Sequence, residues 1–180
     1  MNWNCIKLFG IGLAVLLLGC APSPSVSVSP SESADSPTTT SIPTVSQAID
    51  APQSLPLTLQ FEAAGQVIQL EEAITPRQQQ IGLMYRRSLA DDRGMIFPSQ
   101  VPHVTRFWMR NTLIPLDMVF LLNGEIQAIE ANVPPCTTPT CPSYGPSMAV
   151  NQVIELRGGR AAELGLQVGQ QLRITATDSD

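Results

Sequence analysis

The sequence predicts a small, mainly β domain of the α+β class, a compact barrel-like sheet accompanied by two short helices. Two observations predict this class. Short apolar or alternating runs recur along residues 55–177 between glycine, proline and asparagine residues, whereas only two stretches carry helix signals. This segment is also long enough to build one hydrophobic core, so we expect a single domain there.

The domain begins with a predicted hairpin and a predicted helix. Residues 57–61 alternate apolar and polar side chains, residues 64–65 supply an Ala-Gly turn, and residues 67–70 return as the second strand. Thr75 has the features of a helix cap, because proline follows it and glutamine stands three residues later. We expect this helix to run from Thr75 to about Tyr85.

The middle of the domain is predicted to be all strand. Residues 94–97 form a brief strand that the next residue, a proline, stops, and residues 106–110 form another. Residues 116–122 are almost continuously apolar, so we expect protein on both faces of that strand. The Asn-Gly pair at residues 123–124 tolerates positive φ and predicts a tight hairpin into residues 125–130.

The last part of the domain adds two strands and the second helix. Residues 150–156 form a strand, and a short helix follows around residues 161–164. Gly165 is suited to a left-handed helix cap. Residues 168–175 are predicted to close the domain as a final strand.

The first twenty residues predict export and attachment to a membrane. The apolar run from Leu8 to Leu18 spans about 16 Å as a helix, whereas a bilayer core needs about 30 Å, so it indicates a signal peptide. The residues around Cys20 (Leu-Leu-Gly-Cys) resemble the lipobox of bacterial lipoproteins. The resemblance implies cleavage before Cys20 and lipidation of its thiol. A plain secretory signal with a chance cysteine is the alternative.

These features divide the chain into four parts. Residues 1–19 are the expected signal peptide, and residues 20–54 are the lipidated cysteine and a tether rich in proline, serine and threonine. Residues 55–177 are the domain, and residues 178–180 are a tail. We therefore expect an exported protein, lipid-anchored to the cell envelope on its periplasmic or extracytoplasmic face.

Charge and cysteine content limit the possible partners. The chain carries 15 acidic against ten basic residues, which argues against binding nucleic acid. The membrane is the expected partner, through the lipid on Cys20. Cys136 and Cys141 are the cysteines left for the domain, and export favours a structural disulfide between them. The alternative is a thiol redox or copper(I)-handling site in their proline-rich loop.

A second group of residues could form a binding site for a small carboxylate or a sugar-like ligand. Arg110, Asn111 and Asp117 flank a predicted tight connection, Trp108 offers a flat apolar wall, and Tyr144 could line the mouth. The alternative is structural: the arginine and the aspartate neutralise each other, and the asparagine satisfies the turn.

Catalysis and metal binding have weaker support in the sequence. His103 is the single histidine, so two cysteines and this side chain do not complete a four-ligand zinc site. We expect no metal, no cofactor and no catalytic residue. The first interpretation is thus a non-catalytic module that binds a small ligand or an envelope protein, and thiol chemistry is second. A hydrolase using Asp117, Asn111 and His103 is a remote third.

Several motifs in the domain resemble one known family. They are Gly-Leu-Met-Tyr-Arg (82–86), Gly-Met-Ile-Phe (94–97), Phe-Trp-Met-Arg-Asn-Thr-Leu-Ile-Pro-Leu-Asp (107–117), Val-Pro-Pro-Cys (133–136), Cys-Pro-Ser-Tyr (141–144), Val-Ile-Glu-Leu (153–156) and Gly-Leu-Gln-Val-Gly (165–169). In this order and spacing they resemble the bacterial and archaeal domain-of-unknown-function family 192. The resemblance implies a small β-barrel-like domain that is often exported, and it implies no activity.

Overall fold

A seven-stranded mixed sheet, β6-β5-β8-β3-β2-β1-β9, organises the part of the chain that the structure describes. The computed structural model describes residues 51–177. The predicted signal peptide, Cys20 and the tail at residues 178–180 lie outside the described residues. No helix between residues 51 and 177 has the length and apolar character needed to cross a membrane.

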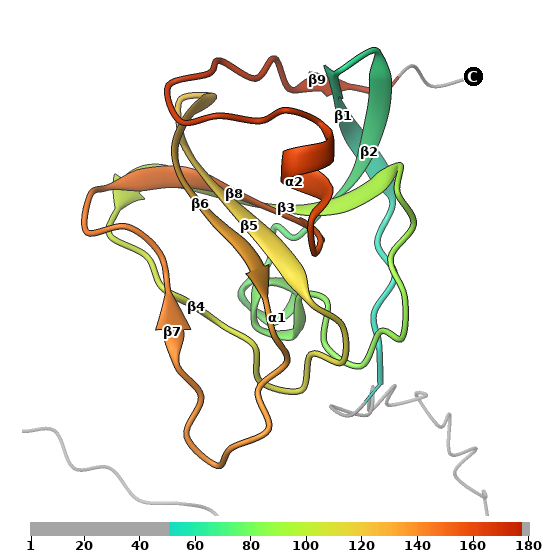
Figure 1. Ribbon diagram of the computed structural model, residues 1–180, viewed down its shortest axis with the longest axis vertical. Helices are drawn as coiled ribbons and strands as arrows, with labels where there is room; N and C mark the ends of the chain where they lie inside the picture. The colour runs from blue at the N-terminus through green and yellow to red at the C-terminus, as the bar shows by residue number, and fades with distance from the viewer. Residues whose placement is uncertain (1–50, 178–180) are drawn as a thin grey trace, which may run out of the picture. The chain divides into compact units, whose positions relative to one another are not determined.

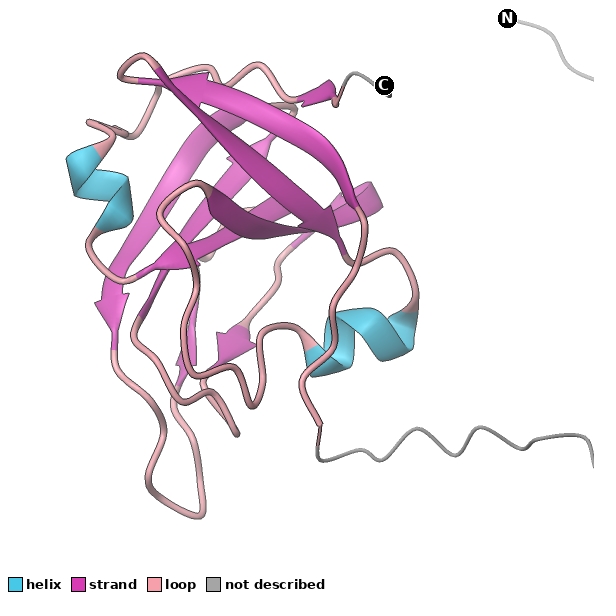
Figure 2. Cartoon of the chain, turned by 90° about the vertical axis from the view of Figure 1, so that its right-hand side faces the viewer, coloured by secondary structure: helices cyan, strands magenta, loops and turns pink. Residues whose placement is uncertain are grey.

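Nine strands and two short helices follow one another along the chain (Figure 1). They are β1 (Leu57–Ala63), β2 (Gln66–Glu72), α1 (Pro76–Ile81), β3 (Arg93–His103), β4 (Phe107–Trp108), β5 (Leu116–Leu122), β6 (Glu125–Val133), β7 (Ser143–Tyr144), β8 (Val150–Arg157), α2 (Arg160–Glu163) and β9 (Thr175–Ala176). The predicted fold class, mainly β with two short helices, is confirmed. Figure 2 shows the two helices lying on either side of the strands.

The large sheet is strongly curved and nearly returns on itself, but its strands do not form a closed ring within the described residues. Its edges are β6 and β9. The segment after α2 spans the gap between them, because Gln171 bridges to Glu125 at the start of β6 before the chain joins β1 as β9. All neighbouring strands are antiparallel except β2 and β3. The smaller sheet pairs β4 with β7.

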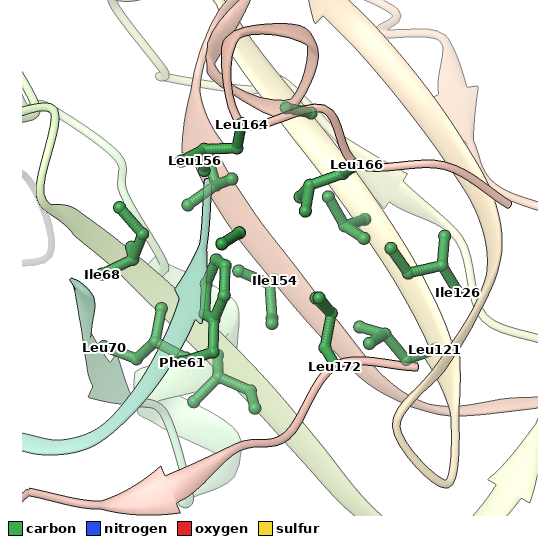
Figure 3. Close-up of a cluster of buried hydrophobic side chains, with 14 residues drawn as sticks. Phe61, Ile68, Leu70, Leu121, Ile126, Ile154, Leu156, Leu164, Leu166 and Leu172 are labelled. Atoms are coloured by element: carbon green, nitrogen blue, oxygen red, sulfur yellow. The ribbon is translucent and has the colours of Figure 1, made fainter. Parts of the chain in front are cut away.

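Two hydrophobic clusters occupy the two faces of the sheet. The first lies under α2 and the segment that follows it, and includes Phe61, Ile154 and Leu172 (Figure 3). The second includes Met118 and Phe120. Successive side chains of β5 enter the two clusters alternately, which explains why its sequence is almost continuously apolar. The expected burial of both faces of this strand is confirmed.

The predicted helix cap and hairpin turn are confirmed. The side chain of Thr75 accepts a hydrogen bond from the backbone N–H of Gln78, and the Gln78 side chain accepts one from Thr75 in return, which forms a complete capping box. Asn123 and Gly124 have φ values of 52° and 84°, as a tight β5–β6 hairpin requires.

The first helix is shorter than predicted. It ends at Ile81, because Gly82 takes a φ of 49° that starts a turn, and Tyr85 also has a positive φ of 64°. A Cβ at Gly82 would lie 3.3 Å from the Phe97 ring, so the close approach of this turn to β3 favours glycine. The early turn is what brings residues 82–84 toward the second cluster.

Three predicted strands have different lengths in the structure. β3 continues through Pro98 to His103, because its pairing with β2 ends at Ile96 and no ladder partner on that side needs the missing proline N–H. The strand predicted at residues 106–110 is reduced to β4. The predicted strand at residues 168–175 is mostly a loop held by single contacts, and only β9 at its end is regular.

Candidate functional site

A cavity of about 260 Å³ opens where the turn after α1, the end of β3, β4 and β8 meet. Its apolar wall contains the rings of Phe97, Phe107 and Trp108. Its polar lining includes His103 and Glu155. The Phe97 and Phe107 rings are 5.0 Å apart between centroids in an edge-to-face arrangement, so this wall is a packed aromatic surface.

Glu155 is the unusual residue of this cavity. It lies near the middle of β8, and its register partners are Met95 on β3 and Met118 on β5. Because side chains alternate along a strand, Ile154 contributes to the first cluster while Glu155 points with Val153 toward the second. A carboxyl group therefore sits between two thioether side chains in the hydrophobic interior, and only 5% of the residue is exposed.

The carboxyl group of Glu155 has no partner among residues 51–177. No hydrogen bond or ion pair joins its oxygens to another described residue. Among the side chains of residues 51–177, the one polar atom that is both shielded from solvent and without a hydrogen bond is Oε1 of Gln152. The unpartnered oxygens of Glu155 therefore retain some contact with solvent. Glu155 lines the cavity, so its free hydrogen-bonding capacity is directed there.

Burial controls the protonation of this group. Removal from water raises the pKa of Glu155 to about 8, and the positive charge of Arg86 opposes that rise. Arg86 already forms a two-pronged ion pair with Glu71, with both nitrogen–oxygen distances at 2.7 Å. Its charge is thus largely compensated by another carboxylate, and near neutral pH the Glu155 side chain is predominantly an uncharged acid.

Trp108 forms the exposed rim of the cavity. The residue is 48% exposed, and the guanidinium carbon of Arg110 lies 5.7 Å from its ring centroid in a cation–π contact. Arg106 lines the cavity but donates through Nη1 to the carbonyl oxygen of Gly145. Gly145 has a φ of 134°, and a Cβ there would lie 2.9 Å from the carbonyl oxygen of Thr105, so glycine is required for this contact.

The predicted ligand-binding residues do not all meet at one place. Trp108 lines the cavity and Arg110 stacks on its ring. Asn111 donates from Nδ2 to the hydroxyl oxygen of Tyr85 at 2.7 Å. Tyr144 is half-buried against the second cluster, opposite Phe107 in the small sheet, and does not line the cavity.

Asp117 is fully buried on the opposite side of β5, beneath the start of α2. Its Oδ1 accepts hydrogen bonds from the backbone N–H groups of Asn132 (2.6 Å) and Gly159 (2.9 Å), and Oδ2 accepts one from Ala161 (2.7 Å). It makes no ion pair with Arg110 in the described residues. Its carboxylate holds three backbone segments together, so its contacts are structural ones.

Cys136 and Cys141 are joined in a disulfide, with their Cα atoms 5.7 Å apart. Cys136 packs against the second cluster. His103 lies apart from this pair, at the cavity, where its Nδ1 is 3.1 Å from the carbonyl oxygen of Val101 and 3.4 Å from Oγ of Ser99. Within the described part of the chain, no cluster of three histidine, cysteine or acidic side chains is arranged to hold a metal ion.

Comparison with known proteins decides the family. The model of domain-of-unknown-function family 192, described as an uncharacterized ACR, matches residues 59–174. The chain belongs to this family. No curated protein matches it.

Two solved structures resemble this family 192 chain in both fold and sequence. One is a candidate transcription regulator from Sinorhizobium meliloti 1021, with 32% identity, a TM-score of 0.56, and coverage of 66% of this chain and 92% of that one. The other is a protein of unknown function from Novosphingobium aromaticivorans DSM 12444. It has 32% identity, a TM-score of 0.57, and coverage of 69% of this chain and 95% of that one.

Sequence reasoning missed the principal residue of the cavity in this family 192 domain. Glu155 lies within a motif that carries the family resemblance, but its side chain was not singled out. A signal was present, because it is the single charged residue in the otherwise apolar run Val153-Ile154-Glu155-Leu156. An acid at a core-facing position of a buried strand requires either a partner or a special role.

Proposed function

We propose that this protein is an exported, lipid-tethered module that binds a small uncharged ligand in the cavity beside Glu155. The supporting observation is the buried carboxyl group of Glu155, which faces a cavity without a hydrogen-bonding partner of its own. A buried polar group without a hydrogen-bonding partner destabilises the folded protein. A ligand that forms a hydrogen bond with this group removes that destabilisation, and this favours binding.

The cavity is better suited to binding than to hydrolysis. Glycoside hydrolysis usually uses two carboxyl groups on either side of the bond. Glu155 is the one acidic side chain among the residues that line this cavity. Asp117, the acid of the hydrolase alternative, is occupied by three backbone N–H groups, and Asn111 is engaged with Tyr85.

The charges around the cavity favour a neutral ligand over a carboxylate. The sequence suggested that Arg110 and Asn111 would help to bind a small carboxylate or a sugar-like ligand, but Arg110 stacks on Trp108 and Asn111 donates to Tyr85. The buried ionisable group that lines the cavity is instead the acid Glu155, which offers an anion no counter-charge. Arg106 at the cavity also disfavours a cation.

Trp108 provides a direct test. The sequence has two tryptophans, and the other is Trp3 in the expected signal peptide, so Trp108 is the single fluorescent indole of a cleaved chain. We expect small uncharged compounds, screened against the full mature chain in detergent, to change its emission in a saturable way. Ser99→Phe, which fills the cavity, should abolish the effect.

The matched control is Ser88→Phe, which adds the same ring at an exposed position that does not line the cavity. It should leave the response unchanged. If no compound of a diverse neutral set changes the emission, or if Ser99→Phe and Ser88→Phe respond alike, the cavity is not a binding site and the proposal is wrong.

A further inference from the structure

Resting on the proposed binding function, we infer that the cavity takes a single neutral pyranose ring, held between the carboxyl group of Glu155 and the aromatic wall that ends at Trp108. The inference depends on the size of the cavity, the distribution of polar and apolar groups on its walls, and the hydrogen-bonding requirement of Glu155. Each of these restricts the ligand independently.

The size restricts the ligand to about one ring. A volume of about 260 Å³ lies just below the range of about 300–1,000 Å³ that is usual for small-molecule sites. The aromatic wall cannot easily move outward, because the Phe97 and Phe107 rings pack edge-to-face at 5.0 Å and the Phe107 ring packs in the same way on Phe120, outside the cavity, at 6.0 Å. At this volume an oligosaccharide could place only about one of its rings in the cavity.

The walls divide into an apolar and a polar part, as the two parts of a pyranose do. A sugar ring presents C–H groups on its face and hydroxyl groups around its edge. Phe107 and Trp108 supply an aromatic surface for the C–H groups. Arg110 packs on the Trp108 ring and restricts its orientation, so the platform is ordered before a ligand arrives.

Glu155 selects the hydrogen-bonding chemistry of the ligand. An uncharged carboxyl group has one O–H donor and free acceptor oxygens, so its best partner both accepts and donates. A sugar hydroxyl does both. A ligand amine would share the cavity with the positive charge of Arg106. A ligand carboxylate would lie against the buried acid Glu155, while Arg106 already donates a hydrogen bond to the carbonyl oxygen of Gly145.

A series of sugars with the same pyranose ring and different charges tests the inference. D-glucose and N-acetylglucosamine are neutral, glucosamine is cationic and glucuronate is anionic, on the same ring. Binding to the full mature chain at neutral pH is measured by calorimetry and by saturation transfer to the sugar ring protons. We expect a neutral sugar to bind at least about tenfold more tightly than both charged ones.

Variants assign the contacts. Glu155→Leu should weaken the neutral sugar by about tenfold, the equivalent of one typical hydrogen bond. Glu155→Gln keeps a donor and an acceptor and should stay within about threefold of wild type. Trp108→Ala should remove most of the saturation transfer. Glu62→Gln, an exposed glutamate on β1, is the control for the charge change and should have no effect.

The outcomes separate this inference from the binding function on which it rests. If neutral fragments bind the cavity but no sugar of the series does, the pyranose inference is overturned and the binding function stands. Preferential binding of glucosamine or glucuronate also overturns it. If neither fragments nor sugars bind, both proposals fail.

Discussion

Replacing Glu155 with glutamine should make the protein more stable at alkaline pH while leaving it almost unchanged at acid pH. The ordinary pKa of this side chain is 4.5, and burial raises it to about 8 in the folded protein. At low pH the carboxyl group is protonated in both the folded and the unfolded chain, so its ionisation does not change the free energy of unfolding. Between the two pKa values the unfolded chain releases the proton and the folded chain retains it, so the free energy of unfolding falls as pH rises.

The size of the effect follows from the same two values. Each unit of separation corresponds to 1.36 kcal/mol, so the full penalty above the folded pKa is about 5 kcal/mol. Between about pH 5 and about pH 9 the free energy of unfolding of the wild-type protein should fall by about 4 kcal/mol because of this residue alone. The glutamine of Glu155→Gln cannot ionise, so this variant should not show that fall. The difference is a large share of the total stability of a small domain.

Urea unfolding followed by circular dichroism at several pH values measures the difference. The control is Glu62→Gln, which changes the same group on the exposed face of β1. The curve for Glu62→Gln should run parallel to wild type, whereas the curve for Glu155→Gln should separate from it progressively above about pH 5. If the Glu155→Gln and wild-type curves stay parallel from acid to alkaline pH, then Glu155 titrates like an exposed carboxyl group and its assignment as a buried neutral acid is refuted.

Three further variants test contacts described above. Asp117→Asn turns one acceptor oxygen into a donor facing backbone N–H groups, so urea unfolding should show a loss of about 3–5 kcal/mol, and a loss under about 1 kcal/mol would contradict the structural role. Glu71→Gln leaves the largely buried Arg86 without its counter-charge and should cost about 3–5 kcal/mol in the same assay; an unchanged midpoint would show that the pair is solvated. Replacing both Cys136 and Cys141 with serine should cost about 2 kcal/mol. A reduction potential below about −300 mV marks a structural disulfide, while one near −200 mV would support the thiol redox alternative.

Features that depend on a few neighbouring residues were predictable from the sequence. The capping box at Thr75 and the hairpin at Asn123-Gly124 are both formed as expected, because each needs only residues within one turn. The length of β3 was not predictable in this way. Whether Pro98 stops a strand depends on whether another strand needs its N–H, and that is a property of the sheet.

The roles of the site residues also depend on contacts between segments that are distant in sequence, and these could not be predicted. Asp117 and Glu155 are both acids within apolar strands, and no local pattern distinguishes them. In the structure, Asp117 meets three backbone N–H groups from segments distant in sequence, whereas Glu155 lies between Met95 and Met118 and meets none. The roles of the two side chains are thus set by strand register and loop placement. The sequence analysis placed Asp117 in the ligand-binding site, whereas in the structure Glu155 lines the cavity.

The pairing of β9 with β1 has a consequence for the order of events during synthesis and folding. The backbone N–H of Thr177 donates to the carbonyl oxygen of Thr58, and its hydroxyl donates to that of Leu57, so the first strand is completed by nearly the last described residue (Figure 1). A chain that is still being synthesised lacks this final strand, and the edge of β1 stays open until residue 177 has left the ribosome. The complete sheet can therefore form only after translation of the whole domain, when the pairing brings the first and last strands of the domain together.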